Sequence, residues 1–203
     1  DIRAAAGSCR FEPEPLVELL TSPALSNLRE VDVSGHKGGD QLAIALATSG
    51  PTGIERLRFR ESQITAAGVE ALATSDRFAG LKELDVSFNL FGDAGVAKLL
   101  DKKNLPSLER LYMTRVGATN KGIISLERAN VRDDLDHLSL AMNELGPAAA
   151  KALVKLDLSS LSFLDLSYNK LGDAGAETVI YAPTLQDIAL LHVIENGVER
   201  LLA

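Results

Sequence analysis

The sequence predicts an α/β solenoid, a stack of short repeated units in which strands and helices alternate. The first observation is that LKELDVSFNLFGDAG, starting at Leu81, and LSFLDLSYNKLGDAG, starting at Leu161, agree at every apolar position. The second is that each unit has two hydrophobic periods, and the third is that only 4% of the 203 residues are aromatic. The frame L-x-x-L-x-L-x-x-N-x-L recurs every 24 to 27 residues, and we expect units to begin at Leu28, Ile54, Leu81, Leu108, Leu135, Leu161 and Leu185.

The first half of each unit is predicted to be a strand, and the second half a helix. Leu84 and Val86 alternate with polar residues, which is the pattern of a half-buried strand. The helices that follow are expected to begin at residues able to cap free N–H groups. These capping positions are Thr65, Asp93, Thr119 and Asp173, with Gly146 and Pro147 starting a further helix. Strands that are joined through helices must run parallel.

The chain is expected to form one domain over residues 1–203, whose first unit is incomplete. A partial N-terminal unit, residues 1–24, is expected to contain a helix within residues 11–21 whose Leu16, Leu19 and Leu20 face inward. A final helix is expected over residues 195–203, with Val198, Leu201 and Leu202 apolar. Neither end has the polar outer face of a capping unit. Three explanations stay open: a longer protein, self-association through uncapped ends, or end units that tolerate exposed leucine.

The pattern resembles the leucine-rich repeats of the ribonuclease-inhibitor type, over about residues 25–203. That resemblance implies a right-handed superhelix with a curved parallel sheet on the concave side and helices on the convex side. In this family the Asn of the frame bonds backbone groups of the turn. The Asn is present at Asn89, Asn143 and Asn169, and is replaced by His36, Ser62, Val116 and Val193. We therefore expect less regular turns in four units.

Composition and charge exclude several classes of function. A net charge of −7 argues against a nucleic-acid binder. The single cysteine, Cys9, allows no internal disulfide. No apolar run is long enough to span a bilayer, and residues 1–20 lack the apolar core of a signal peptide. We expect a cytoplasmic protein that binds neither nucleic acid nor membrane.

Several segments partly match motifs for phosphate binding, metal binding or nucleophilic catalysis, but each lacks a residue that the motif requires. The segment SGHKGGDQ, from Ser34 to Gln41, lacks the Lys-Ser/Thr ending of a phosphate loop. The D-x-S-x-N segment at Asp85 lacks the glutamate that ends a calcium loop. The three histidines lie in different units, and Cys9 has no histidine near it in sequence. The sequence therefore predicts no enzyme, no catalytic residue, no metal site and no cofactor.

Positions 3, 5 and 7 of the frame are expected to point out of the concave face, because positions 4 and 6 point into the core. In the first three units these positions form a ladder of alternating charge. Arg56 is expected between Glu30 and Glu83, and Arg58 between Asp32 and Asp85. The ladder is either a charged docking surface or a set of mutual ion pairs, and the second interpretation is favoured. Arg60 is expected to be free to bind a carboxylate or phosphate, because its lateral neighbours Ser34 and Ser87 carry no charge.

The fourth to sixth units place rarer side chains on the same face. Arg110, Tyr112, His137 and Phe163 are expected to be neighbours, with Met142 and Tyr168 on the rim at position 8. Interface hot spots are enriched in tyrosine and arginine. The predicted partner-binding residues are Arg60, Arg110, Tyr112, His137, Met142, Phe163 and Tyr168.

The leading hypothesis is a non-catalytic protein–protein interaction module, or scaffold, that binds a protein or peptide on the concave strand face. Two alternatives stay open. The first is a GTPase-activator-like accessory protein, known for this repeat type, in which Arg60 or Arg115 would reach a nucleotide site. The second is a structural or sensor segment of a larger repeat protein.

Overall fold

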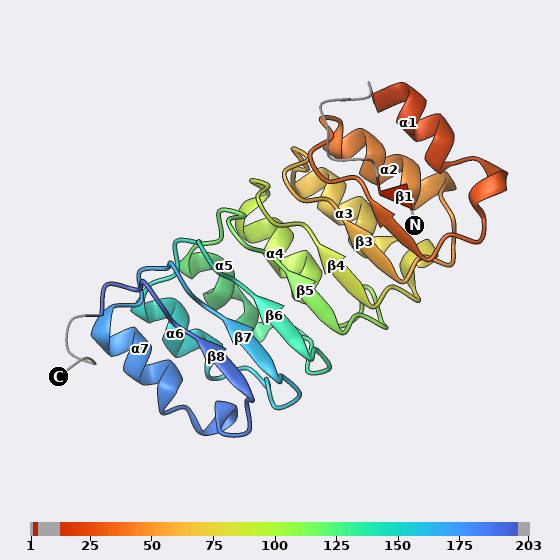
Figure 1. The fold of residues 1–203 in the computed structure, drawn as a ribbon. Coiled ribbons are helices and arrows are strands. Elements are labelled where there is room, and N and C mark those ends of the chain that lie inside the picture. The colour runs from red at the N-terminus through yellow and green to blue at the C-terminus, as the bar shows by residue number, and fades with distance from the viewer. Residues whose placement is uncertain (1, 4–12, 199–203) are drawn as a thin grey trace.

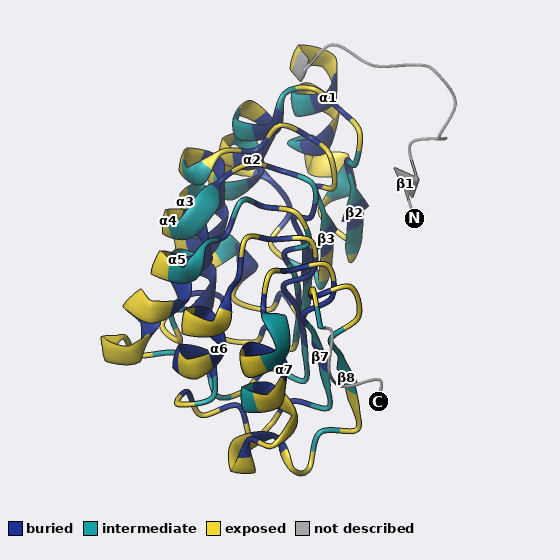
Figure 2. Ribbon diagram, turned by 90° about the vertical axis from the view of Figure 1, so that its left-hand side faces the viewer, coloured by how far each residue is buried: buried dark blue, intermediate teal, exposed yellow. Residues whose placement is uncertain are grey.

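The computed structural model describes residues 2–3 and 13–198 as an open, curved stack of strand–helix units (Figure 1). All described strands belong to one parallel sheet, and each strand pairs with the next one along the chain. The helices lie on the opposite side of the units, and buried residues fill the space between the two layers (Figure 2). The predicted α/β solenoid is confirmed.

The strands are short and in register. Their bounds are β1 Ile2–Arg3, β2 Glu30–Asp32, β3 Arg56–Arg58, β4 Glu83–Asp85, β5 Arg110–Tyr112, β6 His137–Ser139, β7 Phe163–Asp165 and β8 Leu190–His192. Each strand from β2 to β8 has only three residues and cannot bury its apolar side chains by itself. The units are therefore stabilised by packing on their neighbours. The middle residue of each strand from β2 to β7 is buried, and Leu57, Leu84 and Leu111 are completely inaccessible to solvent.

The helices are short as well. Their bounds are α1 Pro13–Leu20, α2 Gly39–Ser49, α3 Ala66–Thr74, α4 Gly92–Leu100, α5 Asn120–Ser125, α6 Pro147–Leu153 and α7 Gly172–Ile180. Single 3-10 turns return the chain toward the next strand, at η1 Pro23–Leu25, η2 Asp76–Phe78, η3 Leu126–Arg128 and η4 Pro183–Leu185. Each helix packs on the next one along the chain, as repeated units require.

Helix starts are fixed partly by the preceding unit. Thr65 and Thr119 are N-caps, as predicted, and the hydroxyl of Thr119 accepts a hydrogen bond from Lys121 N. Gly146 and Pro147 also start α6 as predicted. The prediction for Asp93 is wrong, because Asp93 lies inside α4 and not at its cap. Its carboxylate instead accepts hydrogen bonds from the backbone N and the hydroxyl of Thr119, each at 2.7 Å, in the next unit.

The prediction for Asp173 is wrong in the same way. Asp173 is the second residue of α7, and Leu171 occupies the N-cap position. In both units the glycine before the aspartate, Gly92 or Gly172, already belongs to the helix. Each helix therefore has its N-cap two residues before the aspartate, and the G-D-A-G segment lies entirely within the helix.

The last unit begins three residues later than predicted. Phe163 of β7 pairs with Leu190, which makes Leu190 the position-3 residue and moves the start from Leu185 to Ile188. Leu185 instead ends the 3-10 turn η4. The repeat frame fits the sequence LQDIALLHV whether it starts at Leu185 or at Ile188. Only the pairing of β8 with β7 decides between the two starts. The shift also moves the frame Asn from Val193 to Asn196, which is buried.

The frame asparagines form a ladder of buried hydrogen bonds. Asn89 Oδ1 accepts hydrogen bonds from Ser62 N and Ile64 N, and its amide donates to Phe59 O at 2.7 Å and Val86 O at 2.8 Å. Asn143, Asn169 and Asn196 make the same kinds of bond in their own units. Each asparagine thus joins two adjacent turns.

The structure describes only part of each end of the chain. In α1, Leu16 and Leu20 are buried as predicted, but Leu19 is 47% exposed, because α1 packs on α2 through one face only. Residues 195–198 are a bend followed by irregular chain and not the start of a helix, and residues 199–203 of the predicted final helix lie outside the described residues. Cys9 lies outside them as well. Within residues 2–3 and 13–198, no helix has the length and hydropathy that a membrane span requires.

Candidate functional site

The candidate site is the strand face, meaning the side of the sheet that the helices do not cover (Figure 2). Strand residues that flank a buried middle residue point to this side. Glu30 and Asp32 flank Val31 in β2, and the same arrangement is repeated up to β7. The residues predicted to be neighbours are therefore brought together by pairing in register, as Arg110 is paired with His137, and His137 with Phe163.

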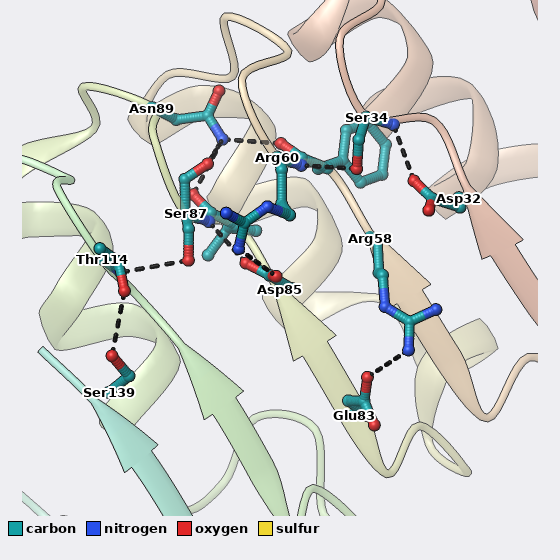
Figure 3. A network of polar contacts seen from close by, with 12 residues as sticks. Asp32, Ser34, Arg58, Arg60, Glu83, Asp85, Ser87, Asn89, Thr114 and Ser139 are labelled. Carbon is teal, nitrogen blue, oxygen red and sulfur yellow. Dashed lines mark hydrogen bonds and ion pairs between the residues drawn. The ribbon is translucent and has the colours of Figure 1, made fainter. Parts of the chain in front are cut away.

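Charged side chains on strands β2 to β4 bind one another. Arg58 bridges two strands. It donates to Glu30 on one side, and on the other side to Glu83 at 2.7 Å (Figure 3). Arg56 lies 3.0 Å from Glu30. The hydrogen bond from Arg58, with smaller effects from Arg56, lowers the pKa of Glu30 below its usual 4.5. The ladder is a set of mutual ion pairs, the interpretation that the sequence favoured.

The partners within the ladder differ from the lateral ones expected. Arg58 was expected between Asp32 and Asp85, yet it reaches the glutamates at the other end of the neighbouring strands. Asp32 instead accepts a hydrogen bond from Ser34 N at 3.0 Å. A long guanidinium side chain reaches diagonally across a strand spacing of about 4.8 Å, so lateral neighbours alone do not decide its partner.

Arg60 is not free, and that prediction is wrong. Its Nη1 lies 2.9 Å from Asp85 Oδ2 (Figure 3). Its guanidinium carbon also lies 4.9 Å from the centre of the Phe88 ring, within the range of a cation–π contact. The diagonal reach that redirects Arg58 also brings Arg60 to Asp85.

Small polar side chains continue the network toward the middle of the sheet. The hydroxyl of Ser87 accepts a hydrogen bond from Thr114 N at 3.2 Å, and Thr114 Oγ1 lies 3.0 Å from Ser139 Oγ (Figure 3). Ser87 and Ser139 are buried. These groups satisfy one another and leave little hydrogen-bonding capacity for a partner.

Strands β6 to β8 carry rings in contact, which we call the aromatic row: His137, Phe163 and His192. The rings of His137 and Phe163 are stacked, with centres 5.4 Å apart and planes at 27°. His192 meets Phe163 edge-on at 5.3 Å. His192 was not predicted as a site residue, because the shifted frame of the last unit hid its place at position 5. The correct register of that unit would have found it.

One ring of the aromatic row is oriented by its neighbour in sequence. His137 Nδ1 lies 2.6 Å from Asp136 Oδ2, and the other carboxylate oxygen of Asp136 accepts a hydrogen bond from Ser162 Oγ. The bond from Ser162, followed by the one from His137, lowers the pKa of Asp136 below 3.8. The carboxylate therefore holds the His137 ring in place beside Phe163.

The remaining predicted site residues lie next to the aromatic row or along the rim. Arg110 approaches Glu83 to 4.0 Å, and burial, helped by the charge of Glu83, raises the pKa of the Tyr112 hydroxyl. Met142 and Tyr168 are 40% and 56% exposed and lie in the loops after β6 and β7. The structure thus groups four of the predicted residues on adjacent strands and sets Met142 and Tyr168 at their edge.

The rim residue at position 8 has a left-handed backbone in every unit, which the sequence did not indicate. These residues are Gly35, Glu61, Phe88, Arg115, Met142, Tyr168 and Glu195, with φ between 51° and 76°. Glycine and asparagine usually fill such positions. The repeated turn accepts large side chains here and presents them along the rim.

The strand face offers ring surfaces, charges and hydrogen bonds, and its groups suit recognition. Within residues 2–3 and 13–198, no three His, Cys, Asp or Glu side chains come close enough to hold a metal ion. The aromatic row instead provides flat, half-exposed surfaces on rigid strands, which suits contact with another macromolecule.

Comparison with known proteins points to one repeat family. A model described as Leucine Rich repeat matches residues 81–100 and 155–179. The ribonuclease inhibitor of Sus scrofa is 31% identical over 89% of this chain and 46% of its own length. The ribonuclease inhibitor of Mus musculus is 32% identical over 69% of this chain and 32% of its own length. This chain spans less than half the length of these relatives.

More distant similarities agree with the fold. The human NACHT, LRR and PYD domains-containing protein 12 is 30% identical over 72% of this chain and 15% of its own length. A solved protein from Bacteroides fragilis superposes with a TM-score of 0.53 at 12% identity, covering 90% of this chain and 70% of that protein. At this identity the likeness concerns the fold alone.

Proposed function

Because this chain is a leucine-rich repeat protein of the ribonuclease-inhibitor-like type, we propose that it binds a protein or peptide partner on its concave strand face. Two relatives are named ribonuclease inhibitor. An inhibitor of a ribonuclease is a protein that acts on another protein. Interaction with a protein is the part of that role that we carry to this chain. The identity of the relatives' partner is not carried over.

The aromatic row is the observation that supports this proposal. His137, Phe163 and His192 form a continuous ring surface across three strands, although the chain is poor in aromatic residues. Rings add large contact area, and rigid strands lose little freedom when a partner binds. The ladder on β2 to β4, by contrast, has already paired its charges. We therefore assign the binding energy to the aromatic row with Tyr112 and Arg110, and orientation to the ladder.

The proposal also includes the organisation of the chain. We propose one non-catalytic domain over residues 1–203, with units starting at Leu28, Ile54, Leu81, Leu108, Leu135 and Leu161, and the last start corrected to Ile188. The alternative of a GTPase activator that uses Arg60 is disfavoured, because Asp85 and Phe88 hold that guanidinium.

The test is a double substitution, Tyr112→Ala with Phe163→Ala, compared with the unchanged chain. Partners captured from an extract of the source cell are identified, and the affinity of each is measured by calorimetry. We expect the double variant to lose at least about 1 kcal/mol of binding free energy, the level that defines a contributing interface residue. Its melting temperature should change little, because both side chains are half-exposed.

Tyr181→Ala is the matched control, since Tyr181 is 72% exposed and follows helix α7 on the other side of the units. Its loss should leave binding unchanged. If the double variant binds every captured partner as tightly as the unchanged chain does, the assignment of binding to this surface is wrong.

A further inference from the structure

A second surface lies on the rim, where strands β2 to β5 run into the loops before their helices. Adjoining hollows in this region all include Glu61 and Phe88 in their walls. Lys37 and Leu90 line one side, and Arg115 lines another. We call this surface the rim groove and define it by Lys37, Glu61, Phe88, Leu90 and Arg115.

The floor of the rim groove is apolar and rigid. Leu90 is 81% exposed, the largest exposure of any large hydrophobic side chain in the described part of the chain. It lies between Asn89, whose amide is fixed by buried hydrogen bonds, and the buried Phe91. Phe88 is half-buried, and the Arg60 guanidinium lies against its ring at 4.9 Å. Covering an exposed leucine removes apolar surface from water, so this floor is a favourable contact for an apolar side chain.

The charges of the rim groove are not paired, in contrast to those of the ladder. Arg56, Arg58 and Arg60 each have an acidic partner. Within residues 2–3 and 13–198, Lys37 and Arg115 have no ion pair, and neither does Glu61. Two cations and one anion therefore remain available around the apolar floor, and their balance favours an acidic partner.

The geometry of the repeat sets the spacing that such a partner must match. Lys37 belongs to the first unit and Arg115 to the fourth, so three strand spacings of about 4.8 Å separate their backbones, or about 14 Å. An extended chain rises about 3.3 Å per residue, so about four residues cover this distance. Phe88 and Leu90, in the third unit, lie between the two cations along the chain order of the units.

We propose that the rim groove binds an extended acidic peptide segment, with an apolar side chain over Phe88 and Leu90 and carboxylates at either side facing Lys37 and Arg115. The two carboxylates would lie about four residues apart. This surface is additional to the strand-face site and uses none of the residues of the aromatic row. The two proposals can therefore fail separately.

The test uses a fluorescein-labelled synthetic peptide library on the full chain. Each peptide has leucine at its centre and aspartate or glutamate two residues to either side, with varied neutral residues elsewhere. Fluorescence anisotropy should show saturable binding at low salt. Leu90→Ala should weaken binding about fivefold, and the double variant Lys37→Glu with Arg115→Glu about tenfold or more. A library with lysine in place of the acidic residues should bind this double variant better than it binds the unchanged chain.

Controls separate the rim groove from other surfaces and from misfolding. Phe88→Asn removes the ring while asparagine still accepts the left-handed backbone, φ 61°, so this variant should fold and should weaken binding. Ile44→Ala and Lys151→Glu change exposed side chains on helices α2 and α6, and should leave binding unchanged. The Tyr112→Ala, Phe163→Ala variant should also bind the library normally.

Several results would overturn the proposal. It fails if no peptide of the library binds saturably, or if Leu90→Ala and the charge reversals leave binding unchanged. Loss of peptide binding in the Tyr112→Ala, Phe163→Ala variant would place the peptide on the strand face. A dimer of the chain alone that disappears in Leu90→Ala, measured by sedimentation, would show that a second copy fills the rim groove.

Discussion

The strand face has two regions that share one backbone and use it differently. On β2 to β4, Arg58 binds Glu30 and Glu83, and Arg60 binds Asp85. On β6 to β8, the same strand positions carry the aromatic row, whose members contact one another through rings. Pairing register is the same in both regions, so the difference lies in the side chains alone. A repeat fixes where side chains point, and leaves open whether they stabilise the fold or contact a partner.

The largest expected effect tests whether the two regions share one scaffold. Asn89 and Asn143 make matching bonds in the charged and aromatic regions, each accepting from two backbone N–H groups and donating to backbone carbonyls. Replacing either by alanine leaves these buried groups without partners. We expect Asn89→Ala and Asn143→Ala each to lower the free energy of unfolding by about 3 kcal/mol, measured by urea denaturation.

Asn130→Ala is the control, because Asn130 is exposed and its backbone oxygen, not its side chain, accepts the hydrogen bond from Lys102 N. It should change stability by less than about 0.5 kcal/mol. A large loss in one ladder variant and a small loss in the other would mean that the regions differ in backbone stability as well as in surface.

The shared scaffold is the part that the sequence predicts well. The period of the frame places Leu84, Leu111 and Leu138 in the core, because alternation and unit spacing depend on local chemistry. The last unit is the exception. Leu185 and Ile188 both satisfy the frame, and only the strand that pairs with Phe163 decides between them.

Side-chain partners across strands are predicted less well. Arg60 has no acidic residue directly opposite it on either neighbouring strand. Its side chain is nevertheless long enough to reach Asp85 diagonally. Arg132 has no signal in the sequence at all. It is 1% exposed and donates to the carbonyl oxygens of Asn104 and Leu105, in an irregular return segment between the fourth and fifth units. Such contacts depend on how two loops pack, which no repeat period records.

The second prediction separates stability from binding. Arg58→Met removes the cation that two half-buried carboxylates share, so the free energy of unfolding should fall by about 1–2 kcal/mol. Affinity for a strand-face partner should change less. Phe163→Ala should show the opposite pattern, with affinity falling by about 1 kcal/mol or more and stability by less than that. Urea denaturation and calorimetry measure the two quantities on the same samples.

Arg56→Met is the matched control for Arg58→Met, because Arg56 is more exposed and, among the described residues, forms an ion pair only with Glu30. Its effect on stability should stay below about 1 kcal/mol, as for an exposed ion pair. If Arg58→Met weakens binding more than Phe163→Ala does, the ladder rather than the aromatic row carries the interface.

The smallest expected effect is a change in the free energy of unfolding with pH and salt. It distinguishes the two carboxyl groups, Glu30 and Asp136, whose pKa values are lowered by different neighbours. The pKa of Glu30 lies below 4.5 first because Arg58 donates to it, and that of Asp136 lies below 3.8 first because the neutral Ser162 hydroxyl donates to it. A carboxyl whose pKa is lower in the folded chain contributes stability at pH values above its unfolded pKa. That contribution is lost as the pH falls through the folded pKa.

Salt should distinguish the two groups. At about 1 M salt the screening length is about 3 Å, so the contribution of the partly exposed Glu30 ion pairs, about 0.5–1 kcal/mol, should shrink. The contribution of Asp136 should persist, since a hydrogen bond from a neutral hydroxyl is little screened. Unfolding free energies of the unchanged chain, Glu30→Gln and Asp136→Asn, taken from pH 7 down to below 3.8 at low and high salt, measure both. Equal salt sensitivity would mean that the charge of His137, and not Ser162, holds Asp136, and the aromatic region would then be a charge network like its neighbour.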